Sequence, residues 1–416
     1  MSKKANYFLG LLSGMGLMVI AVIAFVLSPL HPSTLFDGSS APLRTTPTAA
    51  AAAAELDDTD LMQKLNHIHQ IIDTNFIGDF DLELAIEMMF AGFVYGAGDP
   101  YTVYMDPTTF AAFREETEGS FIGIGVSITV DATDNRMLII SPFEGSPAFE
   151  AGLLPGDKIV RINGYEVFGD GMNEAIRMMR GEAGTEVVVT IYRESSGETF
   201  DVPIIRAVIE VETVRSNILD NNIGYIRISQ FDRVTYEQFA NAYERLMGQN
   251  IEGLIIDLRN NPGGLLDVVN NITNMLIPEG IITYTEDAQG RRVYFPSDAN
   301  YIDIPLVVLV NGNSASASEV LSGAVMDTGV GELLGTTTFG KGLVQNIFPL
   351  RDGSAVKVTV QRYFTPSGRS IHGEGITPNH YVEMDVELTN NLMRISQEED
   401  VQLQEAIRVI GGMIGQ

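Results

Sequence analysis

The sequence contains no cysteine and only five histidines among its 416 residues. The absence of cysteine excludes disulfides, thiol catalysis and thiolate metal sites. The histidines form no HExxH motif or comparable ligand cluster, so we expect neither a metal site nor another cofactor. Basic residues are also few, because 26 Lys and Arg stand against 54 Asp and Glu, for a formal net charge of −28. Such a surface repels phosphate groups, and nucleic acid is therefore not an expected partner.

Several familiar nucleotide-binding and hydrolase motifs are missing as well. The sequence has neither the GxxxxGK[ST] phosphate loop nor the dinucleotide GxGxxG pattern, and it lacks the GxSxG elbow of α/β-hydrolases. Its apolar fraction is 45%. That fraction and the length of the chain are enough for the cores of two or three domains.

The amino terminus carries a long apolar run. Residues 8–27 contain no charge and follow Lys3 and Lys4. A helix of this length, at about 1.5 Å per residue, spans about 30 Å, the thickness of one hydrocarbon layer. The two lysines place the short leading end in the cytoplasm. A cleaved signal peptide is the alternative, but its apolar region usually has only ~7–15 residues. We therefore favour a cytoplasmic tip and single-pass membrane anchor over residues 1–30, with the rest of the chain outside the cytoplasm.

Two further segments precede the first compact module. Residues 31–55 are rich in Pro, Thr, Ser and Ala and are predicted to form a flexible tether. Residues 56–112 are predicted to be a helical region. In its first helix, apolar residues such as Leu61, Leu65 and Ile68 recur at spacings of three and four. A second helix is expected over 82–95, before a Gly- and Pro-containing break.

A separate module is expected over residues 113–207. Its strands are predicted at 121–126, 137–141, 158–162 and 186–192, and its helices at 146–153 and 173–179. Asn163 and Gly164 are typical of a tight hairpin turn.

This order of elements resembles a bacterial PDZ domain. In that family, a glycine-containing loop offers backbone N–H groups to the terminal carboxylate of a peptide, which adds to the sheet as a strand. The matching loop here consists of Ile122, Gly123, Ile124 and Gly125. A bulged or tightly bent strand is the alternative explanation of the two glycines. The uncharged surroundings favour peptides with apolar C-terminal residues.

Residues 208–390 show strands alternating with helices. Strands are expected at 223–228, 253–258 and 305–310, and helices at 236–247, 265–276 and 316–328. This alternation predicts an α/β domain whose mostly parallel sheet is covered on both faces. The final segment, 391–416, is predicted to contain an amphipathic helix over 401–414. This helix, or the helices predicted between residues 56 and 95, could pair with those of a second copy to form a homodimer, although nothing in the sequence requires it.

A serine-rich stretch follows the last of these strands. Residues 313–319 read NSASASE. Ser314, Ser316 and Ser318 lie where a helix begins, and free N–H groups at a helix start can stabilise an anionic oxygen. Ordinary helix capping, with Glu319 in the first turn, explains the same residues. On this stretch alone, helix capping is the favoured interpretation.

A second stretch, residues 339–345, reads FGKGLVQ. A lysine can act as a base for a serine only if burial lowers its pKa enough to leave it neutral. Glycines on both sides of Lys341 and apolar residues beyond them favour a buried lysine over a solvated one. Gln345 follows four residues later, at a spacing suited to orienting the amine. Upstream, residues 259–264 read RNNPGG, which indicates either N–H groups exposed for an oxyanion hole or a plain strand-to-helix turn.

Taken together, these motifs resemble the C-terminal processing (tail-specific) serine proteases over nearly the whole chain. The resemblance rests on the order of membrane segment, helical region, PDZ domain and core, and on the motifs at residues 257–264, 313–319 and 338–345. It implies a core with the crotonase/ClpP-like β/α spiral fold and an inserted PDZ domain. At His372 the family would lead us to expect glutamine.

The resemblance also implies roles for individual residues. It assigns the nucleophile to Ser316, the base to Lys341 and a supporting role to Gln345, and it is the only reason for preferring Ser316 to its neighbouring serines. The oxyanion hole implied by the family consists of the N–H of Ala317 and one from Gly263 or Gly264.

The resulting prediction is a serine endopeptidase at the cell membrane with its catalytic part outside the cytoplasm. It is expected to recognise proteins and peptides with free apolar C-termini and to need no cofactor. A catalytically silent PDZ scaffold or adaptor at the membrane is the alternative, against which the intact Ser, Lys and Gln argue. A trypsin-like protease with a PDZ domain is disfavoured because the sequence lacks GNSGG and an upstream catalytic histidine.

Overall fold

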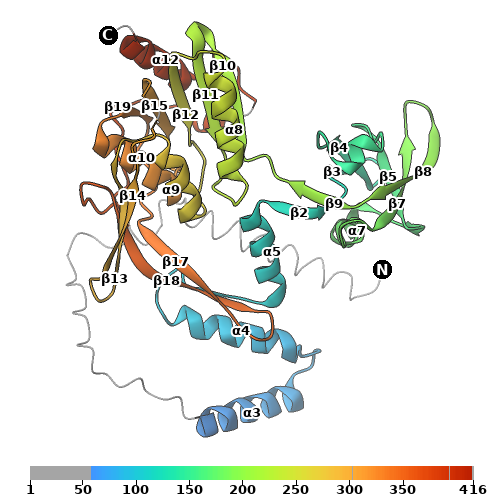
Figure 1. Cartoon of the computed structure of the whole chain (residues 1–416). Coiled ribbons are helices and arrows are strands. Elements are labelled where there is room, and N and C mark those ends of the chain that lie inside the picture. The colour runs from blue at the N-terminus through green and yellow to red at the C-terminus, as the bar shows by residue number, and fades with distance from the viewer. Residues whose placement is uncertain (1–57, 302, 393, 415–416) are drawn as a thin grey trace. The chain divides into compact units, whose positions relative to one another are not determined.

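A computed structural model describes residues 58–301, 303–392 and 394–414 (Figure 1). Contacts divide the chain into two units, one ending at Asp81 and the other beginning at Leu82. The predicted anchor and tether over residues 1–55 lie outside the described residues. Within the described ranges, no helix is both long and apolar enough to cross a membrane.

The described part of the first unit contains one helix, α3 (Asp58–Asn75). It confirms the helix predicted from the spacing of Leu61, Leu65 and Ile68. The loop that follows turns back, and the ring of Phe80 lies 5.7 Å from that of His69, measured between centroids.

The second unit opens with α4 (Leu82–Tyr95), β1 (Val103–Met105) and α5 (Pro107–Glu118). Helix α4 has the predicted bounds, whereas α5 was not identified from the sequence. Its ends nevertheless follow from local chemistry. The Asp106 carboxylate accepts hydrogen bonds from two backbone N–H groups of the first turn, and Gly119 ends the helix in the left-handed region at φ 64°.

The module predicted over 113–207 forms a six-stranded sheet, in the order β3-β4-β5-β7-β8 with β6 beside β5, and a two-stranded ribbon of β2 and β9. Its strands are β2 (Ser120–Gly123), β3 (Val126–Asp131), β4 (Arg136–Pro142), β5 (Lys158–Ile162), β6 (Tyr165–Glu166), β7 (Glu186–Arg193), β8 (Glu198–Ile205) and β9 (Ala207–Glu210). Its helical elements are α6 (Pro147–Glu150), η1 (Gly169–Gly171) and α7 (Met172–Met179). Asn163 and Gly164 both have positive φ, which confirms the predicted hairpin turn between β5 and β6. The predicted single strand over 121–126 is wrong, because Gly125 at φ 78° separates β2 from β3.

The central sheet of the remaining residues has six strands in the order β10-β11-β12-β15-β16-β19. They are β10 (Val214–Leu219), β11 (Ile223–Ile228), β12 (Gly253–Asp257), β15 (Leu306–Val310), β16 (Gly331–Gly335) and β19 (His380–Tyr381). The associated helical elements are η2 (Asp220–Asn222), α8 (Thr235–Met247), α9 (Leu266–Asn274), α10 (Ala317–Thr328), α11 (Val386–Asn390) and α12 (Val401–Ile414). Only β10 pairs antiparallel, so the predicted mostly parallel sheet is confirmed.

A second, antiparallel sheet accompanies the first and was not predicted from the sequence. Its order is β1-β18-β13-β14, and β17 pairs with β18. The strands not yet named are β13 (Gly280–Asp287), β14 (Arg292–Ser297), β17 (Leu343–Pro349) and β18 (Ala355–Phe364).

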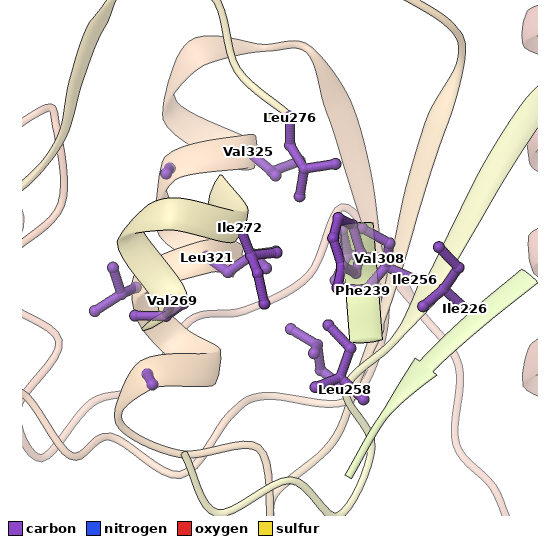
Figure 2. Close-up of a cluster of buried hydrophobic side chains, with 14 of the residues drawn as sticks. Ile226, Phe239, Ile256, Leu258, Val269, Ile272, Leu276, Val308, Leu321 and Val325 are labelled. Atoms are coloured by element: carbon purple, nitrogen blue, oxygen red, sulfur yellow. The ribbon is translucent and has the colours of Figure 1, made fainter. Parts of the chain in front are cut away.

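The main apolar core lies on one face of the central sheet, where α8, α9 and α10 pack (Figure 2). Its residues are buried, and Phe239 of α8, Ile272 of α9 and Leu321 of α10 are fully buried. Each such side chain contributes about 1.5–3 kcal/mol through burial. On the other face, α12 covers a smaller apolar cluster that includes Ile410. Helices thus cover both faces, as predicted, and fix the ends of β12 and β15 from which the site loops emerge.

Candidate active site

Ser316 lies between β15 and α10 and has an unusual backbone conformation. Its φ is 55° and its ψ is −113°, outside the regions that residues with a side chain normally adopt. Such a conformation costs about 1–3 kcal/mol and is retained only where the surroundings enforce it, often at functional sites. The geometry therefore singles out Ser316 within the serine-rich stretch.

The two neighbouring serines have structural partners. Ser314 and Ser318 are fully buried. The hydroxyl of Ser314 donates to the carbonyl oxygen of Leu258 at 2.8 Å, and that of Ser318 donates to the carbonyl oxygen of Asn261 at 2.9 Å. Ser316, by contrast, lines a cavity of about 320 Å³. The choice of Ser316, which the sequence left to family resemblance, thus has a physical basis in the structure.

The buried carboxylate of Glu319 connects the Ser316 turn to the loop that carries Lys341. It is 0% exposed and accepts four hydrogen bonds. Three come from the backbone N–H groups of Ser316 (2.9 Å), Gly340 (2.8 Å) and Lys341 (2.8 Å), and the fourth comes from the Thr338 hydroxyl (2.6 Å). Bonds to a charged acceptor in a buried place are strong. Glu319 does more than cap α10, because it fixes the backbone positions of both candidate catalytic residues.

Lys341 lines the same cavity as Ser316. Burial lowers the pKa of Lys341, and the neighbouring ammonium of Lys357 lowers it further, while Asp99 and Glu319 act in the opposite direction. The net shift favours the neutral amine that a base must have. The hydroxyl of Tyr363 lies 2.6 Å from the carbonyl oxygen of Lys341 and 2.9 Å from that of Ser316, which adds a second link between the two segments.

Gln345 reaches the same cavity from β17, where a bulge interrupts the register between Val344 and Gln345. Its Nε2 atom is buried and has no hydrogen-bond partner. In the described part of the chain, no hydrogen bond joins Lys341 to Gln345 or to the hydroxyl of Ser316. The structure therefore brings the three predicted residues together without linking their side chains.

The predicted oxyanion residues lie beside Ser316 but differ in their backbone contacts. Ala317 and Gly264 line the cavity. The N–H of Gly263 instead donates to the side-chain oxygen of Asn261 at 2.8 Å. Gly263 packs so closely that an added Cβ would lie 2.8 Å from the Cβ of Ser316. Gly264 is therefore the better donor for an oxyanion, and Gly263 allows the close approach.

The cavity is also lined by charged groups that the sequence did not indicate. Glu116 comes from α5, Asp232 from the loop after β11, and Lys357 from β18. Burial raises the pKa of Asp232 to about 6; repulsion from Glu116 adds to the shift, although a hydrogen bond with Gln230 opposes it. Burial lowers the pKa of Lys357, against the attraction of Glu116.

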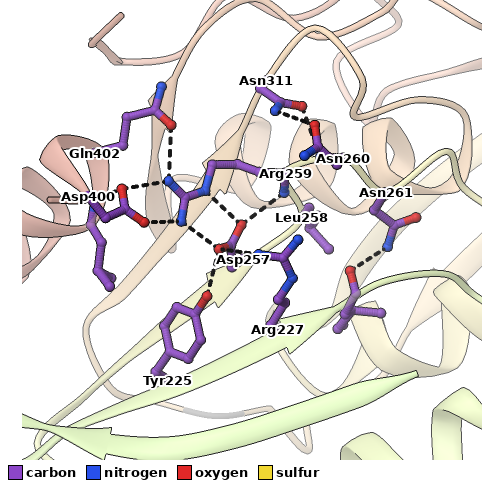
Figure 3. A network of polar contacts seen from close by, with 12 residues as sticks. Tyr225, Arg227, Asp257, Leu258, Arg259, Asn260, Asn261, Asn311, Asp400 and Gln402 are labelled. Atoms are coloured by element: carbon purple, nitrogen blue, oxygen red, sulfur yellow. Dashed lines mark hydrogen bonds and ion pairs between the residues drawn. The ribbon is translucent and has the colours of Figure 1, made fainter. Parts of the chain in front are cut away.

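A buried ionic network holds the start of the glycine loop (Figure 3). Arg259, 1% exposed, donates to both carboxylate oxygens of Asp257 at 3.0 and 2.7 Å and to both of Asp400 at 2.8 and 2.7 Å. Gln402 accepts a further bond from Arg259, and the hydroxyl of Tyr225 donates to Asp257. Burial opposes the charge on Asp257, but the Arg259 guanidinium outweighs it and keeps the pKa of Asp257 below its usual value. The start of α12 is thereby tied to the loop that carries Gly263 and Gly264.

The predicted peptide-binding loop lies at a separate cavity of about 180 Å³ between β3 and α7. Gly123, Ile124 and Gly125 line it, whereas Ile122 does not and instead pairs with β9. The remaining lining is apolar except for Arg180, as expected for a groove that takes an apolar chain end: Phe121, Val126, Ile128, Ile176 and Met179.

The environment of the loop suits a peptide terminus. The side chain of Ile124 is buried in the core of the module. In the described structure, no hydrogen bond uses the N–H of Ile124 or Gly125. Arg180 forms an ion pair with Glu115 and lies over the ring of Phe121.

Sequence reasoning missed several residues of the site. The most direct is Tyr101, whose ring centroid lies 4.9 Å from the Lys341 amine. Lys357, Asp232 and Glu116 were also missed, because they come from segments that only the fold brings together. The sequence offers one usable signal, because Tyr101 directly follows the Gly- and Pro-containing break at residues 96–100.

Comparison with known proteins decides the family. A model of peptidase family S41 matches residues 222–382, and a PDZ domain model matches residues 139–193. The carboxy-terminal processing protease CtpB of Bacillus subtilis is 36% identical over 340 residues, which cover 80% of this chain and 70% of the relative. The chain belongs to the carboxy-terminal processing proteases of peptidase family S41. The predicted family and enzyme class are thereby confirmed.

Other relatives agree with this placement. The carboxyl-terminal-processing protease of a Synechocystis strain is 37% identical over 319 residues, covering 76% of this chain and 74% of the relative. Among solved structures, the photosystem II D1 C-terminal processing protease is 32% identical, covers 79% of this chain and 88% of its own, and gives a TM-score of 0.46. The two family models and the curated relatives show that this carboxy-terminal processing protease is a serine peptidase with a PDZ domain.

Proposed function

We propose that this protease is an extracytoplasmic endopeptidase that captures apolar protein C-termini in its PDZ groove and cleaves with Ser316 and Lys341. The observation that carries the proposal is the shared cavity. Of the three serines in the stretch, Ser316 alone lines that cavity, and it does so beside a lysine whose pKa is lowered. The core is proposed to share the crotonase/ClpP-like spiral that the family resemblance implies.

The proposed reaction begins with neutral Lys341. Its amine takes the proton of the Ser316 hydroxyl as the oxygen attacks the substrate carbonyl carbon. The resulting anionic oxygen is stabilised by the N–H groups of Ala317 and Gly264. The Lys341 ammonium then gives its proton to the leaving amine as the peptide bond breaks. Water then attacks the acyl carbon while neutral Lys341 takes its proton. The ester bond to Ser316 breaks, and the Lys341 ammonium returns that proton to the Ser316 oxygen.

Gln345 has a supporting role in this proposal. Its Nε2 atom is buried without a partner, and an unpaired buried donor is costly. A turn of the Lys341 side chain towards Ser316 would let the amine donate a hydrogen bond to the amide oxygen of Gln345, which orients the amine and leaves its lone pair free for the Ser316 proton. Gln345 would act by positioning the base.

The proposed substrate terminus is tested with paired peptides. A peptide with an apolar free C-terminus is expected to show a kcat/KM at least about tenfold above that of its C-terminal amide, because the loop N–H groups bind a carboxylate. Arg180→Met should bring this ratio towards one, since Arg180 is the cation of the groove. The matched control is Arg177→Met on the same helix, whose exposed side chain pairs with Glu174. Equal rates for acid and amide in the wild-type enzyme would contradict tail capture, and binding without cleavage would favour a silent scaffold.

The proposed membrane anchor rests on the apolar run at residues 8–27. The full chain is expected to stay in the membrane fraction after alkaline carbonate extraction, whereas a chain that lacks residues 1–30 should be released. Protease added to intact cells should degrade the catalytic part. Amino-terminal sequencing provides the decisive control, since a mature terminus beyond residue 27 would mean that the run is a cleaved signal peptide.

A further inference from the structure

The turn between α4 and β1 is built to hold the ring of Tyr101 in place. The Asp99 carboxylate accepts hydrogen bonds from the N–H of Tyr101 at 3.1 Å and from the hydroxyl of Thr102 at 2.7 Å. The hydroxyl oxygen of Thr102 in turn accepts a bond from the N–H of Thr359 in β18 at 3.1 Å. The turn is thus tied to the strand that also carries Lys357, and the position of the ring is set by the fold.

The Lys341 amine lies against this ring. The distance from its Nζ atom to the ring centroid is 4.9 Å, within the range of a cation–π contact. Meanwhile, the candidate partners of the amine do not engage it: in the described structure no hydrogen bond joins Lys341 to Ser316 or to Gln345, whose Nε2 atom is unpaired. The side chain is therefore held on the Tyr101 side of the cavity.

We infer that Tyr101 is a positioning residue for Lys341, whose ring provides the resting place of the ammonium form, from which the amine turns towards Ser316. This inference rests on the proposed Ser/Lys mechanism. The face of an aromatic ring attracts a cation and not a neutral amine. Proton loss thus weakens the contact with Tyr101 and frees the side chain to accept the Ser316 proton.

The charged groups around Lys341 determine in which direction its pKa should change when the Tyr101 ring is removed. Attraction by Asp99 and Glu319 favours the ammonium, whereas burial and repulsion by Lys357 favour the amine and lower the pKa of Lys341. The remaining titratable groups of the surroundings are Glu116, Asp232 and Tyr363. The ring adds to the groups that favour the ammonium. Its removal should lower the pKa of Lys341, and since the base must be neutral, the acid limb of the rate profile should move to lower pH.

The test measures kcat/KM against pH for the full chain with the free-acid peptide. Tyr101→Leu, which keeps an apolar side chain but removes the ring, is expected to move the acid limb down by roughly 0.5–1 pH unit. Tyr101→Phe retains the ring and should show the same dependence of kcat/KM on pH as the wild type. Lys357→Gln should move the limb in the opposite direction, because it removes a repelling charge. A limb that stays in place or moves to higher pH in Tyr101→Leu, with or without a lower rate at all pH values, overturns the inference.

A second readout separates this inference from the proposed function. In a Ser316→Ala background, competitive labelling with acetic anhydride and mass spectrometry of the Lys341 peptide report the neutral fraction of the amine without any cleavage. Tyr101→Leu should shift this labelling curve to lower pH by the same amount, and an unshifted curve overturns the role of Tyr101. If the curve shifts but the wild-type enzyme cleaves no peptide, the proposed function fails, whereas the contact between the Tyr101 ring and the Lys341 ammonium stands.

Discussion

Lys341→Met is expected to lower kcat/KM at neutral pH by about ten-thousand-fold, the scale seen when a member of a catalytic unit is removed. Methionine has a similar length and keeps the cavity filled, but it cannot accept the proton of Ser316. The expected loss falls mainly on kcat, since the peptide terminus binds elsewhere, in the PDZ groove. In the wild-type enzyme, kcat/KM should rise with pH through the pKa of Lys341, which burial holds below the usual lysine value. Steady-state cleavage of the free-acid peptide across pH checks both expectations.

Two controls make the result interpretable. Lys64→Met changes an exposed lysine of α3 and should leave kcat/KM unaltered. The thermal unfolding temperature of Lys341→Met should be no lower than that of the wild type, because the substitution removes a partly buried charge. A variant that keeps more than a tenth of the wild-type rate, or whose loss is confined to KM, would rule out Lys341 as the base.

Arg259→Met is expected to reduce the free energy of unfolding by about 3–5 kcal/mol, as when one partner of a buried ion pair is removed. The change leaves the carboxylates of Asp257 and Asp400 buried and close together without their shared cation. The pKa of Asp257 is lowered in the folded protein, so its contribution to stability is present above the pKa of the unfolded state and is lost as the pH falls. The difference between wild type and variant should therefore be largest near neutral pH and shrink in acid. Urea unfolding at several pH values measures it.

Arg233→Met is the matched control for this substitution. Arg233 pairs with Asp267 at 2.7 Å, but both side chains are more than half exposed. Surface pairs of this kind contribute about 0–1 kcal/mol. A loss below about 1 kcal/mol in Arg259→Met would mean that the network contributes no more than such a surface pair.

The elements that the sequence predicted well are those with a strong local pattern. Helix α4 and strand β5 have the predicted bounds, and α8, α9 and α10 differ from theirs by one or two residues. The antiparallel sheet was missed because its strands present mixed faces. In β18, for example, most side chains are half-buried, so no clean alternation is visible. Its pairings with β1 and β13 join distant segments that no local pattern connects.

The residues of the candidate site also differ in how far the sequence can predict their roles. Ser316 and Lys341 lie in short motifs of small residues, but the sequence indicated Ser316 only through the family resemblance, because Ser314 and Ser318 have similar local neighbours. Arg259 and Asp400, however, are separated by 141 positions, and only the docking of α12 brings them together. Tyr101 is still more remote from Lys341 in sequence, and a tyrosine in a turn gives no sign of what its ring will contact. Predicting these contacts requires the tertiary fold.

The four hydrogen bonds of Glu319 limit how the Ser316 and Lys341 segments can move relative to each other. Because one carboxylate holds the backbone of Ser316 and that of Lys341, the two segments are constrained to move as a single rigid piece. Loop displacement is then a poor means of changing the separation of hydroxyl and amine. The long side chain of Lys341 keeps its rotatable torsion angles inside this frame, so the proposed approach of the amine to the Ser316 hydroxyl needs no displacement of either backbone segment.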